Sequence, residues 1–130
     1  MRDFDMTVRE IDLNAGFTAW DTNVDAAAPW PFRTRMHRFT QADGPDAHDH
    51  PFGIEVYIPL NGGGYVEEVF FVDGRSEMFE RLPGTSFYIP ATRVHRIDRL
   101  LAPVVWTQTI TGPWEQDWRV YPEAEIRNAG

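Results

Sequence analysis

The chain has 130 residues, a length typical of one compact domain. Its formal net charge of −8 disfavours nucleic acid and anionic membrane surfaces as partners, because both require a basic surface. Cysteine is absent, which excludes disulfides and thiolate chemistry, and all twelve basic residues are arginines, which excludes Schiff-base chemistry on lysine. We expect a cytoplasmic protein, since the N-terminus has no apolar leader and no stretch approaches membrane-spanning length.

Most of the chain is expected to form short strands separated by turns. Turn residues recur about every ten residues, and only 123–127 suggests a helix. This pattern predicts an all-β sandwich or barrel rather than a parallel α/β sheet. We expect one domain over 1–130, with a core at about 33–113, an N-terminal edge strand or arm at 1–32 and a C-terminal tail at 114–130. The predicted strands lie at 7–11, 16–20, 33–40, 54–60, 65–72, 78–82, 86–89, 94–100 and 104–111.

Candidate metal ligands are found in the middle of the chain. His48 and His50 are two residues apart, so both imidazoles lie on one face of an extended strand. A bend after His50 is expected to bring Glu55 back toward them, and His95 is the fourth candidate. Imidazole and carboxylate groups together suit a divalent first-row metal such as iron, manganese, zinc or nickel.

Two motifs resemble the signatures of the cupin family. The resemblance covers about residues 33–113, with departures at Thr92 and Arg99, where the family commonly has glycine and asparagine. It implies a jelly-roll barrel, also called a double-stranded β-helix, in which the three histidines and the glutamate hold one divalent metal ion, with iron as our first expectation. The motifs are His48-x-His50-x4-Glu55-x6-Gly62 and Gly84-x5-Pro90-x4-His95.

A narrower resemblance is to a set of uncharacterised single-domain cupins from bacteria and phages, from which no activity can be carried over. It rests on His37-Arg38-Phe39, His48-Asp49-His50-Pro51-Phe52, Gly63-Gly64-Tyr65 with Glu67-Glu68, Arg81-x-Pro83-Gly84, and Thr111-Gly112-Pro113 with Trp118.

Strand alternation predicts further residues around the metal. If Glu55 faces the cavity, so does Tyr57, and if His95 does, so does Arg99. We predict that Tyr57 is catalytic, as a donor of a hydrogen bond or proton, and that Arg99 binds a substrate carboxylate. Further predicted substrate contacts are Arg38, Tyr88 and Gln108. For each arginine, a surface charge is an equally good interpretation.

Other polar residues receive structural interpretations. His37 lies outside both signatures and is interpreted as a hydrogen-bonded structural histidine. Glu67 and Glu68 are interpreted as solvated. Asp49 is interpreted as a turn or solvent-facing residue, with hydrogen bonding to a ligand imidazole as the alternative.

The favoured hypothesis is a metal-dependent enzyme that acts on a small anionic or oxygen-rich organic substrate. Dioxygenase, an oxidoreductase chemistry, and isomerase or lyase chemistry are all compatible with it. The alternative is a non-catalytic cupin that binds or senses a small ligand, and a metal-free barrel of the sugar-epimerase kind is less favoured. We also expect a homodimer, because the aromatic content leaves apolar faces to cover and an edge strand within 1–20 could pair with a second copy.

Overall fold

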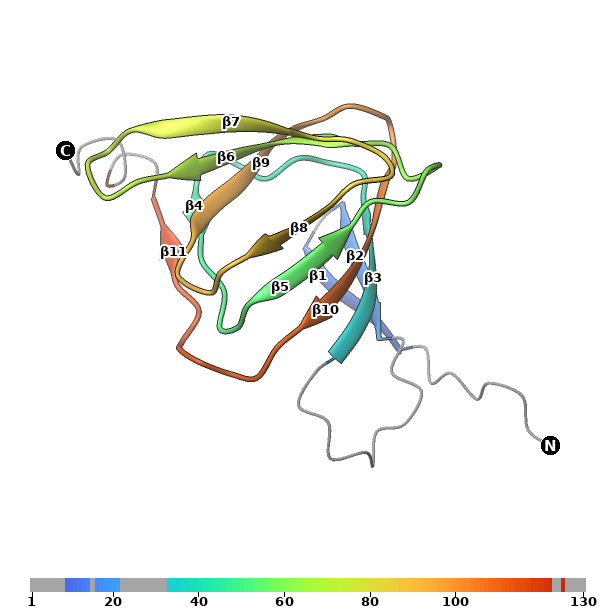
Figure 1. Ribbon diagram of the computed structural model, residues 1–130, viewed down its shortest axis with the longest axis horizontal. Helices are drawn as coiled ribbons and strands as arrows, with labels where there is room; N and C mark the ends of the chain where they lie inside the picture. Colours follow the sequence, from blue (N-terminus) through green and yellow to red (C-terminus); the bar gives the residue numbers. More distant parts are fainter. Residues whose placement is uncertain (1–8, 15, 22–32, 123–124, 126–130) are drawn as a thin grey trace.

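The structure is a computed structural model that describes residues 9–14, 16–21, 33–122 and 125 (Figure 1). The predicted strands at 86–89 and 94–100 are found with these bounds, and the two-residue strands β4 (Ala47–His48) and β11 (Val120–Tyr121) were not predicted. The predicted helix at 123–127 falls, except for Glu125, outside the described residues. The strands are β1 (Arg9–Asn14), β2 (Phe17–Asp21), β3 (Arg33–Phe39), β4 (Ala47–His48), β5 (Ile54–Tyr57), β6 (Tyr65–Phe70), β7 (Ser76–Arg81), β8 (Ser86–Ile89), β9 (Val94–Leu100), β10 (Val105–Thr111) and β11 (Val120–Tyr121).

These strands form two antiparallel sheets, which confirms the all-β prediction. One sheet has the order β1-β2-β3-β10-β5-β8 and the other the order β11-β4-β9-β6-β7. The two sheets form opposite walls of the molecule, with β6, β7 and β9 on one side and β3, β5 and β10 on the other (Figure 1). In the six-stranded sheet β1 is an edge strand.

Alternation of apolar and polar side chains determines which faces of the strands meet in the interior. In β5, Ile54 and Val56 are buried and cluster with Ile89 of β8. A second cluster joins Ile58 and the strands β6, β9 and β10, and contains Tyr65, Ile97 and Val105. Burying the apolar faces of two sheets against each other is the main stabilising contribution in such a sandwich.

A bulge interrupts β9 near its end. Val66 of β6 lies opposite Arg99, but the next residue, Glu67, lies opposite Ile97, so Asp98 has no place in the ladder. Asp43 Oδ2 accepts a hydrogen bond of 2.6 Å from the Ile97 amide at this point. After the bulge, the alternation of inward and outward side chains along β9 is shifted by one residue, so Arg99 does not share the face of His95 and Ile97.

The segment after β10 returns to β4 and is fastened there. The Asp49 carboxylate accepts hydrogen bonds from the Arg119 amide (2.8 Å) and from the Tyr121 hydroxyl (3.1 Å). Asp49 is therefore buried and binds the C-terminal segment, instead of being the turn or solvent-facing residue that the sequence suggested. In the described part of the chain, no helix has the length and apolar character needed to cross a membrane.

Candidate metal centre

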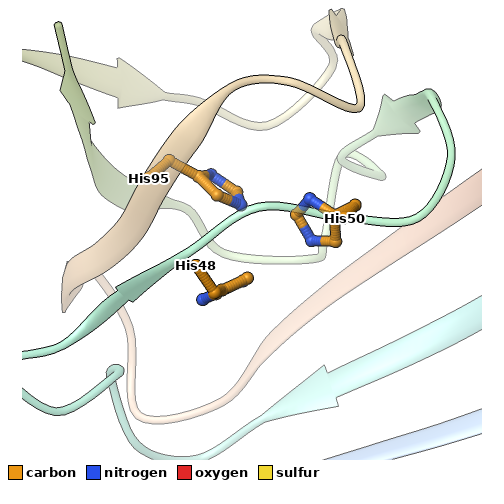
Figure 2. A group of neighbouring side chains, drawn as sticks. All are labelled: His48, His50 and His95. Carbon is orange, nitrogen blue, oxygen red and sulfur yellow. The ribbon is translucent and has the colours of Figure 1, made fainter. Parts of the chain in front are cut away.

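Three histidines converge in the interior. The rings of His48, His50 and His95 lie 4.9 Å apart, centroid to centroid, in each of the three pairs. One nitrogen from each ring can be chosen so that all three lie within 4.8 Å of one another. Figure 2 shows His95 extending from β9 toward the two rings carried by β4 and the residues after it. The predicted meeting of these three histidines is confirmed.

Strand pairing accounts for this convergence. His48 and His95 are direct partners across β4 and β9, so their side chains leave the same face of the sheet. His50 is two residues beyond His48 and returns to that face, while Asp49 between them faces the C-terminal segment. The His50 backbone is held by its own amide, which donates to the Ala91 carbonyl at 3.3 Å.

Glu67 orients one of the three rings. Its Oε2 lies 2.6 Å from His95 Nδ1, and its Oε1 accepts a hydrogen bond of 2.6 Å from Arg81 Nη2. Burial alone would raise the pKa of Glu67, but the hydrogen bond and charge of His95, followed by those of Arg81, outweigh burial and lower it. The carboxylate is thus ionised and accepts the Nδ1 proton of His95, which leaves the Nε2 lone pair for another ligand.

The imidazoles meet the requirements of metal ligands. Burial, followed by repulsion from His95, lowers the pKa of His48 to about 4. Burial, followed by repulsion from His95 and His48, lowers the pKa of His50 to about 2. Both rings are therefore neutral at pH 7, as coordination requires. His95 Nε2 and His50 Nδ1 are buried without a hydrogen-bond partner among the described residues, which fits a site that a cation completes.

The histidines line a cavity of about 640 Å³. This volume is within the range of small-molecule sites. Its walls are mainly apolar and include Phe17, Phe39, Phe52, Ile54, Val56 and Ile89, together with Trp114 and Trp118 from the C-terminal segment. Trp114 and Trp118 are 67% and 58% exposed, so they lie where the cavity meets solvent. Gln116 between them donates from Nε2 to the carbonyls of His50 and Ala91, both at 2.9 Å, and so holds this segment over the histidine centre.

Glu55, the predicted fourth ligand, faces the other way. Ile54 and Val56 line the cavity, so alternation along β5 turns Glu55 outward. There it is exposed and borders a separate surface pocket of about 290 Å³ together with Tyr88 and Ile110. The prediction that Glu55 joins the histidines is wrong, and the cluster consists of three imidazoles.

Three other residues that were predicted to line the site share the outward face of Glu55 and therefore lie outside the cavity. Tyr57 is two residues from Glu55 and is also exposed. Gln108 is its direct partner on β10, and Tyr88 is the partner of Glu55 on β8. Because cross-strand partners share a face, the predicted catalytic role of Tyr57 and the predicted substrate contacts of Tyr88 and Gln108 are not supported.

The two predicted substrate-binding arginines also lie outside the cavity. Arg99 follows the bulge of β9, its side chain is 61% exposed, and it contacts Asp98. Arg38 faces the outer surface of β3, where its guanidinium lies 5.2 Å from the Trp20 ring and 6.0 Å from the Trp106 ring and donates to Thr18. Neither arginine can bind a ligand at the histidine centre.

The sequence did not predict the roles of Glu67, which contacts a ring of the histidine centre, and of His37, which lines the cavity. Glu67 and Glu68 were interpreted as solvated, but both are buried, and Glu67 reaches His95. His37 lines the cavity, and its Nε2 has no partner among the described residues, in contrast to the hydrogen-bonded role assigned to it. A usable signal existed for Glu67, because a glutamate within the apolar run of 65–72 must be paired if that strand is buried on both faces.

Comparison with known proteins gives a consistent fold and no close relative. No family model matches the sequence, and no curated protein matches it. The polyketide cyclase RemF from Streptomyces resistomycificus superposes with a TM-score of 0.65 at 14% identity, covering 98% of this chain and 90% of that one. Bacillus subtilis oxalate decarboxylase gives a TM-score of 0.65 at 19% identity over 89% of this chain and 30% of that one. Vicilin from hazelnut (Corylus avellana) gives 0.65 at 14% identity over 92% and 36%.

These neighbours all have the cupin fold, and so does this chain. The likeness shows the fold and no more at these identities. The chain spans about a third of the length of the oxalate decarboxylase and vicilin chains, and nearly the whole of RemF. Mn(II) centres are described for the oxalate decarboxylase. The narrower resemblance to uncharacterised bacterial and phage cupins stays a prediction.

Proposed function

We propose that this protein is a metal-dependent cupin enzyme that acts on a small, mainly apolar organic molecule carrying an oxygen group. The observation that carries the proposal is the convergence of three imidazoles, two of them with buried and unpartnered nitrogens, on a mainly apolar cavity. Because imidazoles coordinate in their neutral form, a divalent ion bound by these three rings would keep its positive charge and supply a Lewis acid toward a substrate oxygen.

Residues of the chain supply the remaining parts of the site. Glu67 fixes the tautomer of His95, and Gln116 holds the segment that carries Trp114 and Trp118 against the cavity. The apolar walls favour a ring or a short hydrocarbon body and exclude water from it. Arg99 and Arg38, the arginines predicted to bind a substrate carboxylate, lie outside the cavity, and Arg35 is the one arginine among the described residues that line it, so we propose a mainly apolar substrate with at most one acidic group.

The metal identity and reaction type are part of the proposal. Iron is our first expectation, with manganese, zinc and nickel as alternatives that imidazole also binds. We favour lyase, isomerase or cyclase chemistry through polarisation of a substrate oxygen, and similarity in fold and chain length to the cyclase RemF supports this choice. Oxygen consumption by iron-loaded protein with substrate would instead identify dioxygenase chemistry.

Metal analysis of three variants tests the centre. The wild type, purified anaerobically, should contain about one divalent ion per chain, and His50→Ala and His95→Ala should lose it. His37→Gln is the matched control, because His37 lines the same cavity but lies outside the ligand group. Wild-type metal content in both ligand variants would refute the proposed centre.

A further inference from the structure

Two residues that line the cavity outside the histidine centre carry buried polar atoms without hydrogen-bond partners in the described part of the chain. His37 Nε2 and Thr109 Oγ1 are both buried and have no hydrogen-bond partner among the described residues. Thr109 is only 4% exposed. An unpaired buried polar group costs free energy, so two such atoms facing one cavity indicate a position where a ligand supplies the missing partner.

The strand register places the two residues side by side. His37 on β3 lies opposite Thr107 on β10, and Thr109 lies opposite Arg35, so His37 and Thr109 are diagonal neighbours on the inner face. Such diagonal pairs are about 7 to 8 Å apart, a span that one small group between them can bridge. The His37 ring packs edge-on against Phe17 at 5.0 Å and 88°, which restricts its orientation.

Their chemistry selects the group they can bind. A threonine hydroxyl can donate or accept, and a neutral imidazole nitrogen does one or the other according to its tautomer. A ligand hydroxyl can likewise donate to one partner and accept from the other. We propose that His37 and Thr109 form a second polar subsite that binds a hydroxyl group of the substrate, while another oxygen of the same molecule approaches the histidine centre.

This inference deepens the proposed function and rests on it for the second oxygen. It defines the substrate class as a hydroxylated aromatic or similarly apolar body with oxygen groups at two positions. The subsite lies on β3 and β10. The proposed metal ligands lie elsewhere: His48 on β4, His50 just after β4, and His95 on β9. The two sites can therefore be tested separately.

The test compares p-cresol with p-xylene, which have nearly the same shape and differ by one hydroxyl in place of a methyl. Both are titrated into metal-free protein by ligand-observed NMR, and the ratio of their dissociation constants is compared between variants. Thr109→Val and His37→Phe should each reduce the relative preference for p-cresol by about 3- to 10-fold, as expected for one lost hydrogen bond. Thr107→Val, a change at the next inward position of the same strand, should leave the ratio unchanged.

The outcomes separate the subsite from the metal centre. A ratio unchanged in both Thr109→Val and His37→Phe, or shifted equally in Thr107→Val, overturns the subsite. Because Thr109→Val preserves side-chain shape, it keeps the test decisive even if His37→Phe fails to fold. Metal uptake is measured on separate aliquots of each preparation after incubation with one equivalent of Fe(II), so an intact hydroxyl preference in a wild-type protein that takes up no metal would overturn only the proposed function.

Discussion

Glu67 Oε2 lies 2.6 Å from His95 Nδ1, and the same carboxylate is bound on its other oxygen by Arg81. The Arg81–Glu67–His95 hydrogen bonds hold the carboxylate against Nδ1 of His95. They therefore leave Nε2 as the nitrogen that can coordinate a metal ion. They also explain how a buried carboxylate is tolerated, since both of its oxygens have charged or polar partners.

Glu67→Gln should weaken metal binding by about 10- to 100-fold, because the neutral amide holds the His95 proton less firmly and lowers the basicity of the ring. Competition with a chelator of known affinity measures the change. Glu68→Gln is the matched control. Glu68 is as buried as Glu67, but it lies on the other face of β6, away from the histidines, and pairs with Arg96 at 2.8 Å. Equal metal affinities for the Glu67 and Glu68 variants would argue against this role of Glu67.

Acid should destabilise the metal-free protein between about pH 6.5 and pH 4. Burial, followed by the charge of Arg35, lowers the pKa of His37 to about 4, while the unfolded chain has its ordinary value. In this window the unfolded state binds more protons, so stability falls as the pH falls and the loss ends near the folded pKa. For His37 the loss is at most about 3 kcal/mol, at 1.36 kcal/mol for each pH unit between the unfolded and the folded pKa.

Urea denaturation of metal-free protein at several pH values checks this expectation. His37→Phe should flatten the slope below pH 6.5, since it removes one of the titrating groups. His48 and His50, whose pKa values are lowered to about 4 and about 2, remain in the variant and retain part of the slope. A slope identical to the wild type would show that His37 does not titrate as its environment implies.

The fold and the three histidines could be predicted because their signals are local. Gly and Pro turns delimit the strands, and the spacing of His48 and His50 fixes their common face whatever the rest of the chain does. Contacts between distant segments could not be predicted in this way: a Cβ at Gly53, the residue before β5, would collide with the Tyr88 side chain of β8, and no local pattern reveals this.

The predictions for the remaining site residues were wrong because their side chains point away from the cavity. The segment Ile54-Glu55-Val56-Tyr57 alternates apolar and polar residues, which by itself places Ile54 and Val56 inside, whereas the cupin signature suggested the opposite face. Because cross-strand partners share a face, the wrong face assigned to β5 also gave the wrong face for its partners on β8 and β10. In β9 a bulge, at which Asp43 accepts a hydrogen bond from the Ile97 amide, changes the direction of Arg99.

Thr109→Val should stabilise the ligand-free protein by about 0.5–2 kcal/mol. The hydroxyl is buried without a partner among the described residues, so replacing it by a methyl removes an unmet desolvation cost and adds apolar burial. Thr107→Val is the control, the same substitution at a similarly buried position of the same strand. Chemical denaturation measures both, and a destabilised Thr109→Val would mean that its hydroxyl is satisfied in solution.

The outer face of the six-stranded sheet is where we expect a second copy to bind. Tyr57, Tyr88 and Ile110 are 39%, 53% and 47% exposed, and they lie on adjacent strands of β8-β5-β10. Neighbouring exposed apolar side chains of this size are typical of association surfaces.

Ile110→Glu should therefore convert a homodimer into a monomer, because a carboxylate placed in an apolar interface loses hydration without gaining a partner. Sedimentation velocity at tens of micromolar protein measures the assembly state, with about 30 kDa expected for the wild-type dimer, twice the 15.0 kDa chain. Val72→Glu is the control, since Val72 is 97% exposed and lies outside this face in the turn between β6 and β7. A wild-type monomer would remove the prediction of a dimer, and a dimer that persists in Ile110→Glu would move the interface elsewhere, with the edge strand β1 as the next surface to test.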